Sequence, residues 1–457
     1  MFSYMKQDQG FYKQTARLTL PIILQNIISS TLSMADTFMV GILGEAQMAA
    51  LTLANIPFFV IVLYLFGVQN GSGILISQYW GKGDTDSIHK VVGISMWLSI
   101  IVTGLIAVAV YAFPVEFMSL FGNDPEVVEL AAGYGKIIGF SYFLNGFTLM
   151  YSGAYRSMGQ PKLGMYLLGV SMMLNLFLNW VFIYGNLGFE AMGVKGAALA
   201  TLMARGLEVV IMVFHGFCGK NNPLKLTQLF SFHKPMAKKF FKYCLPVVFN
   251  ETAWGMGTSV APTVMGHMAG STEILAAYAL ASNMEKLVMV AGFGIGASSG
   301  IIIGNAIGAG SPKEKILPMG HCLGMMGFLI GSVSGLCLWL FTLTLFPLSM
   351  APMFKLSLEA TKIAQIMLYF LAIMMGLRTF NTVAVVGVFR AGGDSKKSMF
   401  VDLIPLWCVA IPVTVLSGTA LHLSIFWVVM AMKLEDLVKF FVGLYFIRSD
   451  AWIHDVT

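Results

Sequence analysis

One carboxylate lies inside an apolar segment near the start of the chain. Asp36 belongs to the stretch Leu18–Gly41, with Ala35, Phe38 and Met39 around it. About 20 helical residues at 1.5 Å each cross a bilayer, so this stretch is long enough to span one. A carboxylate there costs roughly 2.5–3.5 kcal/mol on insertion scales, and we expect it to face a protein interior or a wet cavity. It would bind a cation or a proton; the alternative is a helix-end aspartate that reaches the interface or a local backbone group.

Two asparagines have the chemistry to complete such a site. Asn175 and Asn179 are four residues apart and therefore share one face of a helix. Their amides offer oxygens to a cation such as Na⁺ and N–H donors to a carboxylate. The alternative is hydrogen bonding between helices, worth about 0.6 kcal/mol per bond on average. Thr201, in the next apolar segment, could add a hydroxyl group.

A second acid and two prolines mark the equivalent segment later in the chain. Each acid follows a proline: Glu251 comes five residues after Pro246, and Asp36 comes fifteen residues after Pro21. Proline inside a helix removes a backbone hydrogen bond and bends the helix. We expect Pro21 and Pro246 to be kinks with a part in gating, and Glu251 to serve either transport or a structural ion pair.

The composition identifies the elements that must position these residues. Apolar residues make up 57% of the chain and charged residues only 11%, against about 25% charged in ordinary soluble proteins. Sustained alternation of period two is missing, which argues against a β-barrel. The sequence therefore predicts an all-α polytopic membrane protein.

Several classes of function are disfavoured by the same sequence. The net charge of +6 is modest and is explained by loops at a membrane surface, so no nucleic-acid partner is expected. The five cysteines lack CxxC spacing, which argues against a disulfide framework and a zinc site. Signatures of metalloproteases, serine hydrolases and nucleotide-binding loops are missing, so we expect no enzyme and no cofactor beyond a coupling ion.

Twelve transmembrane helices can be placed. The basic residues between them fall almost entirely on one side, with only Lys195 and Lys355 on the other. By the positive-inside rule this predicts a multi-pass protein of the plasma (inner) membrane with both termini in the cytoplasm; we expect a monomer. The predicted spans are 16–40, 51–79, 91–112, 131–153, 163–185, 194–216, 243–266, 276–306, 317–345, 361–388, 399–418 and 423–446.

The two halves of the chain repeat. Four motifs recur in the same order at nearly the same separation, which predicts an internal duplication. Each half has an even number of spans, so the repeats are parallel, with a central cavity expected between them. We predict an N-lobe at 1–216, a basic cytoplasmic linker at 217–242 and a C-lobe at 243–457. The matched pairs are Leu20-Pro21 with Leu245-Pro246, Ala49–Ala54 with Ala276–Ala281, Phe66–Gly73 with Phe293–Gly300, and Tyr155–Lys162 with Phe389–Lys396.

The acids do not occupy equivalent places in the two repeats. Asp36 aligns with Ala261, and Glu251 aligns with Asn26. We therefore expect ion coupling to depend mainly on the N-lobe.

These motifs give the chain a resemblance to a known family. It resembles the multidrug and toxic compound extrusion (MATE) transporters in its Leu-Pro openings, the Asp36–Gly41 end of the first span, its Gly-rich second and eighth spans, and the Asn175–Gly185 stretch. The resemblance implies export of amphipathic, often cationic, drug-like compounds across the lipid bilayer by antiport with Na⁺ or H⁺. It also implies that Asp36 is the N-lobe coupling carboxylate, in a polar cluster with Asn175 and Asn179.

The chain departs from the family pattern at two positions. Similar transporters often carry an acid where this chain has Asn179, and pair the glutamate of span 7 with an aspartate where it has Thr379. Arg378, beside Thr379, is therefore a candidate counter-charge for Glu251, because a pair satisfies both groups in a low-dielectric interior.

Other classes of protein remain as alternatives. A flippase for lipid-linked glycans, in the same superfamily, would be favoured by clustered arginines in the cavity. A membrane-embedded enzyme would show clustered histidines or acids at one face. A major-facilitator transporter would carry an arginine-rich turn after span 2, which Gly81–Asp84 does not resemble.

Overall fold

The structure is a computed structural model in which residues 5–122, 124–218, 222–225, 229, 233–350 and 356–457 are described. Within those residues all regular structure is helical. The chain divides into two compact units: an N-unit, Leu24–Val248, and a C-unit, which combines Met1–Ile23 with Phe249–Thr457.

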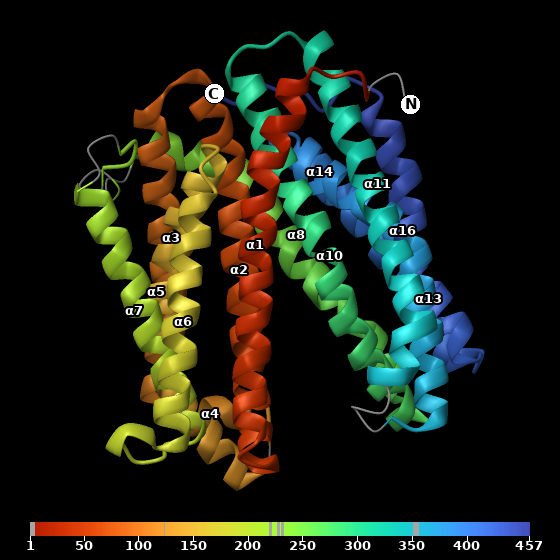
Figure 1. The fold of residues 1–457 in the computed structure, drawn as a ribbon. Coiled ribbons are helices and arrows are strands. Elements are labelled where there is room, and N and C mark those ends of the chain that lie inside the picture. The colour runs from red at the N-terminus through yellow and green to blue at the C-terminus, as the bar shows by residue number, and fades with distance from the viewer. Residues whose placement is uncertain (1–4, 123, 219–221, 226–228, 230–232, 351–355) are drawn as a thin grey trace. The chain divides into compact units, whose positions relative to one another are not determined.

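The N-unit is built around one helix. α5 contacts α2, α3, α4, α6 and α7, and Figure 1 shows it beside α3 and α6. Its elements are the later part of α1 (Gln9–Gly41), then α2 (Glu45–Lys82), α3 (Thr85–Ala112), α4 (Pro114–Ser119), α5 (Pro125–Ser157), α6 (Lys162–Tyr184), the 3₁₀ turn η2 (Asn186–Gly188), α7 (Val194–Cys218) and the start of α8 (Lys234–Thr258).

The C-unit has the same plan. Its central helix is α13, which contacts α10, α11 and α16; α5 and α13 correspond to the fourth and tenth predicted spans. Its elements are the end of α8, α9 (Val260–Gly266), α10 (Ser271–Gly308), α11 (Lys313–Leu345), η4 (Phe346–Met350), α13 (Leu358–Thr382), η5 (Val383–Phe389), α14 (Ser395–Ile404), η6 (Pro405–Ala410), α15 (Ile411–Val415), η7 (Leu416–Ala420) and α16 (Ile425–Ile447). The η elements of this unit are π-helical.

Small residues let the central helices approach closely. Gly327, Gly331 and Gly335 repeat every fourth residue along α11 and face α13. A methyl group added at Gly335 would lie 2.3 Å from the carbonyl oxygen of Ala372. Glycines at this spacing allow backbone contact between membrane helices, so the sequence pattern accounts for the close packing of α11 on α13.

The prediction of twelve spans is confirmed for ten. Ten described helical segments are long and apolar enough to cross a membrane. The predicted spans 243–266 and 423–446 are helical, as α8 with α9 and as α16, but are not among those ten. α16 carries Lys433, Glu435, Asp436 and Lys439 within it. These four charged residues, and not a low hydropathy, set α16 apart from the ten, although Lys439 is ion-paired inside the protein.

The chain passes between the units inside two helices. It does so in α1 two residues after Pro21 and in α8 two residues after Pro246, and both helices continue past their prolines. Residues 1–23 belong to the C-unit because early α1 contacts α10, where Thr19 Oγ1 and Ser298 Oγ are 2.7 Å apart. The division therefore differs from the predicted lobes at 1–216 and 243–457. Part of the predicted linker 217–242 lies outside the described residues, as does Lys355.

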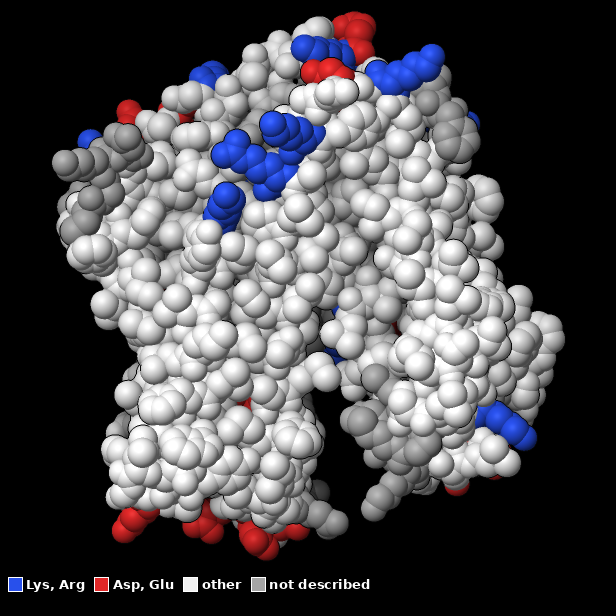
Figure 2. Space-filling view, in the orientation of Figure 1, with Lys and Arg blue, Asp and Glu red and all other residues white. Residues whose placement is uncertain are grey.

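The two ends of the N-unit carry opposite charge. Glu116 on α4 and Glu126 at the start of α5 lie at one end, and acidic side chains gather there in Figure 2. Lys82 ends α2 and Arg156 is in the last turn of α5, at the other end. This is the charge asymmetry on which the predicted orientation depends.

The segment after α16 supplies a buried anchor. Trp452 is only 2% exposed. Its ring packs against Gly320, where a Cβ atom would lie 3.0 Å from the ring. Two residues later, the backbone N–H of His454 donates to the carbonyl of Gly392 at 2.7 Å. These contacts join the segment to α11 and to the turn after η5.

We predict that Trp452→Ala lowers the free energy of unfolding by about 3–5 kcal/mol, because it removes a large buried ring and leaves a cavity. Thermal unfolding of the purified protein in detergent measures this. Trp427→Ala is the matched control: that ring is 51% exposed on α16, and its loss should change stability by about 0.5 kcal/mol or less. Equal effects of the two changes would contradict the prediction.

Candidate functional site

Four polar side chains from three helices meet inside the N-unit. The Asn179 amide donates to Asp36 Oδ1 at 2.5 Å and to Asn175 Oδ1 at 2.9 Å. The Asn175 amide donates in turn to Thr201 Oγ1 at 3.2 Å. The structure thus brings together four of the five residues that the sequence suggested for cation coupling, from α1, α6 and α7; the fifth, Glu251, belongs to the C-unit.

The cluster is buried and has an unused acceptor. Asn175 is 1% exposed and Asn179 is 0% exposed. Both amide protons of Asn179 are donated, but its own oxygen, Oδ1, has no hydrogen-bond partner in the described structure. A buried acceptor without a donor is unfavourable and is rare in folded proteins. A cation beside Asp36 would satisfy this oxygen.

Asp36 has no basic partner. No ion pair to it is formed by the described residues, although Arg205 and Glu208 pair with each other nearby at 2.7 Å. Carboxylate, amide and hydroxyl oxygens are the ligands that hard cations prefer. No group of three or more His, Cys, Asp or Glu side chains in the described part of the chain is arranged so that it could hold a metal ion.

The cluster opens onto a cavity. The cavity has a volume of about 400 Å³ and is formed entirely by N-unit residues, within the range of small-molecule sites. It reaches from Asp36 to Gln25, which is about 16 Å along α1 at 1.5 Å per residue. Arg156 and Glu208 line it as well. Its walls are partly polar, which suits an amphipathic ligand.

The sequence missed most of the ionic chemistry of the C-unit. Glu251 does not pair with Arg378 as expected; its partner is Arg390, with Nη1 2.6 Å from Oε1. Arg378 instead contacts Glu285 at 2.5 Å and Asp436 at 3.4 Å. The two arginine side chains point to different helices. Arg378 extends from α13 toward α10 and α16, whereas Arg390, just after η5, extends toward α8 and therefore meets Glu251.

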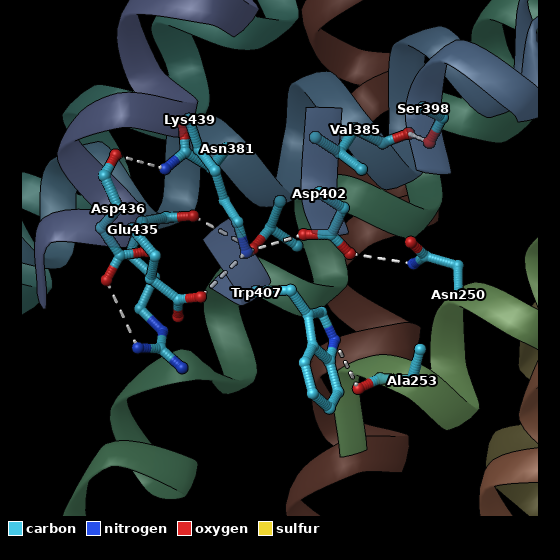
Figure 3. Close-up of polar contacts among 12 residues, drawn as sticks. Asn250, Ala253, Asn381, Val385, Ser398, Asp402, Trp407, Glu435, Asp436 and Lys439 are labelled. Atoms are coloured by element: carbon cyan, nitrogen blue, oxygen red, sulfur yellow. Dashed lines mark hydrogen bonds and ion pairs between the residues drawn. The ribbon is translucent and has the colours of Figure 1, made fainter. Parts of the chain in front are cut away.

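A chain of buried charges extends from this region. Figure 3 shows Lys439 between Asp402 and Glu435, at 2.8 and 3.3 Å. Asn250, next to Glu251, donates to Asp402 at 2.8 Å. Asp402 lies inside the predicted eleventh span. An acid within a membrane span needs a partner, so the sequence could have indicated this network from Asp402.

Thr379 takes no part in this network. It is 1% exposed and packs between α10 and α11, where its side chain limits the space beside Gly292 and Gly331. The missing acid is therefore replaced by a packing residue. Each C-unit acid described above has a basic partner, which leaves Asp36 as the unpaired acid of the two networks.

Comparison with known proteins agrees with the predicted duplication. The family model MatE matches residues 21–181 and again 246–416. The matches begin at Pro21 and Pro246, the residues that open the two repeats.

Relatives cover nearly the whole chain. "Probable multidrug resistance protein NorM" of Thermotoga maritima is 25% identical over 446 residues, 96% of this chain and 93% of the relative. NorM of Pasteurella multocida is 25% identical over 450 residues, 93% of each chain. "Uncharacterized transporter YisQ" of Bacillus subtilis is 22% identical over 442 residues, 95% of this chain and 94% of the relative.

Solved structures share the fold. A MOP superfamily transporter from Pyrococcus furiosus has a TM-score of 0.85 at 22% identity, covering 97% of this chain and 96% of that one. An outward-facing multidrug resistance MATE family transporter has a TM-score of 0.85 at 21% identity, covering 98% and 96%. Because the family model matches both repeats and the relatives extend along almost all of the sequence, the chain belongs to the MatE family and is a multi-pass membrane transporter, not an enzyme.

Proposed function

We propose that this transporter exports amphipathic, mostly cationic organic compounds by antiport with Na⁺ or H⁺. The observation that carries the proposal is Asp36: a carboxylate without a basic partner, held by buried amides and open to a cavity of about 400 Å³. The multidrug-resistance names of the NorM relatives support the class of substrate.

The proposed orientation follows from charge. The protein lies in the cytoplasmic (inner) membrane with both termini in the cytoplasm, so that the basic end of the N-unit faces inward and the end with α4 faces outward. The acidic residues at α4 support this placement. One chain supplies the whole cation cluster and its cavity, and the transporting species is a monomer.

In this mechanism a cation from outside binds Asp36 and the free oxygen of Asn179. It neutralises the carboxylate, changes α1 in the region of Pro21, and lowers the affinity for the cationic compound. A membrane potential supplies about 2.3 kcal/mol per charge per 100 mV. Since 1.4 kcal/mol is a tenfold ratio, one cation entering at about 100 mV sustains a gradient of about fortyfold for a compound without net charge. Exchange of one cation for a monocationic compound moves no net charge, and the concentration gradient of the ion drives it instead.

The flippase alternative receives less support. It calls for clustered, available arginines in the cavity. Two arginines line the N-unit cavity, and one of them, Arg205, is neutralised by Glu208.

Asp36→Asn is predicted to abolish cation-driven efflux, because it removes the carboxylate that the coupling ion is proposed to bind. Efflux of a cationic dye is measured in vesicles with imposed Na⁺ and H⁺ gradients in separate experiments, which also identifies the ion. Glu116→Gln is the control, since it removes an exposed carboxylate from α4 and should leave efflux intact. Wild-type rates in Asp36→Asn would exclude the proposed role.

The hydrogen-bonded chain predicts a graded series. Asn179→Ala removes the free amide oxygen that the proposal places on the cation, and should raise the half-saturating Na⁺ concentration by about tenfold or more, since about 1.4 kcal/mol of lost binding is a tenfold change. Asn175→Ala and then Thr201→Val should have smaller effects, because they reach Asp36 only through Asn179. Asn186→Ala, in η2 outside the cavity, is the control. An effect of Thr201→Val as large as that of Asn179→Ala would show that the order is wrong.

For Glu251 we propose a supporting role rather than direct coupling. Its partner Arg390 has a side chain only 3% exposed, and removing one partner of a buried pair costs about 3–5 kcal/mol. Glu251→Gln should therefore lower thermal stability while the number of cations per dye stays unchanged. The double change Glu251→Gln with Arg390→Gln should recover part of the stability. A changed stoichiometry in a stable Glu251→Gln protein would instead make Glu251 a coupling residue.

A further inference from the structure

The N-unit cavity contains a positive group that the proposed mechanism does not use. Arg156, in the last turn of α5, lines the cavity and donates from Nη2 to Gln69 Oε1 at 2.9 Å. It forms no ion pair with any carboxylate in the described residues. A guanidinium group has five N–H donors, so one amide oxygen leaves most of them unused.

The residues around Arg156 hold it in place without neutralising it. Gln69 is fixed by a second hydrogen bond, from its Nε2 to the carbonyl of Leu149 at 2.8 Å. Gly153 makes room for Gln69, because a side chain there would begin 2.6 Å from the Gln69 amide. Glu208 lines the same cavity, but both of its oxygens are taken by Arg205, and Thr148 donates to it as well.

In the second repeat, the arginine at the equivalent position has an acid as its partner. Arg390 occupies the position equivalent to Arg156 and pairs with Glu251 at 2.6 Å. The residue equivalent to Glu251 is Asn26, which lines the cavity together with Arg156. The N-unit has therefore kept the base of this pair and lacks the acid, and the space near it is open.

We propose that Arg156 is an anion-binding residue for the transported compound, so that the substrates include zwitterions with a carboxylate or similar acidic group. The proposal rests on the proposed export function and specifies its substrate class. The acidic group binds the Arg156 guanidinium, which can hold a carboxylate with two parallel hydrogen bonds. The cationic part lies toward Asp36, which lines the same cavity. The α1 wall of that cavity measures about 16 Å from Gln25 to Asp36, a length that suits an extended amphipathic molecule.

The test uses two dyes that differ in a single charge: rhodamine B, a zwitterion with a free carboxylate, and its methyl ester, a cation. Binding to the purified protein is measured by fluorescence anisotropy without any ion gradient. Arg156→Gln should weaken rhodamine B binding by about tenfold or more, since hydrogen bonds to charged groups are lost. Binding of the ester should stay within about twofold, and Arg156→Lys should restore part of the affinity for the acid.

A second variant tests the same site without removing the arginine. Asn26→Glu introduces at the equivalent position the acid that the second repeat carries. The new carboxylate should pair with Arg156 and so neutralise the anion site. Rhodamine B should then bind about tenfold more weakly, whereas the cationic ester should bind as well as before or more tightly. Opposite effects on the two dyes cannot come from loss of folding, so this variant decides the matter if Arg156→Gln proves unstable.

Lys162→Gln is the matched control, because it removes an exposed positive charge at the start of α6, outside the cavity. Displacement of rhodamine B by phosphatidylglycerol, but not by phosphatidylcholine, would support the anion site and show that lipid headgroups also enter it. Equal losses for both dyes in Arg156→Gln, or unchanged rhodamine B binding in Asn26→Glu, would overturn the proposal. Both results are measured by binding alone and do not depend on ion coupling. Efflux of the ester driven by a cation gradient tests the export function separately. If that efflux is present, the export function stands even when the Arg156 proposal fails; if it is absent, only the export function is contradicted.

Discussion

The hydrogen bond from Asn179 to Asp36 is the contact on which the site depends. An ionised carboxylate in a low-dielectric interior needs either a counter-charge or aligned dipoles. Here it has dipoles: Asn179 donates to Asp36, and Asn175 and Thr201 extend the same line of hydrogen bonds. Dipoles stabilise a negative charge without cancelling it, so the carboxylate can still attract a cation. A lysine at position 179 would satisfy Asp36 permanently and remove that capacity.

The C-unit holds its acids in the other way. Glu251 contacts Arg390, Asp402 contacts Lys439, and Glu285 contacts Arg378. A cation could bind such an acid only by displacing a base, which would leave that base buried and unpaired. The duplication has thus conserved the order of helices and the central position of the fourth helix of each repeat, while the charges have diverged. Asp36 aligns with Ala261, which is not an acid, so the proposed coupling depends on one repeat.

What could be predicted from the sequence was local. The length of the apolar stretches predicted the helices, and helical spacing placed Asn175 beside Asn179 and Arg205 beside Glu208. The partner of Glu251 could not be predicted, because Arg390 is 139 residues away and the choice between it and Arg378 depends on how α13 and η5 are rotated. The number of charged residues alone is a poor guide to α16, because its charges are neutralised by neighbours distant in sequence, such as Asp402. The division inside α1 depends on contacts such as Thr19 with Ser298, which no spacing reveals.

The charges of the N-unit cavity also bear on how ion binding and release of the compound are linked. Arg205 and Glu208 cancel, so Asp36 and Arg156 leave the empty cavity neutral overall. When a cation binds Asp36, the remaining unpaired charge is that of Arg156, and the cavity becomes positive. At an effective dielectric constant of about 20, two unit charges separated by about 16 Å, the length of the cavity wall from Gln25 to Asp36, interact with only about 1 kcal/mol. This repulsion is small beside the lost contact with Asp36. In the proposed mechanism, competition for the carboxylate therefore supplies most of the exchange, and the proposed role of Arg156 is to select which compounds are bound.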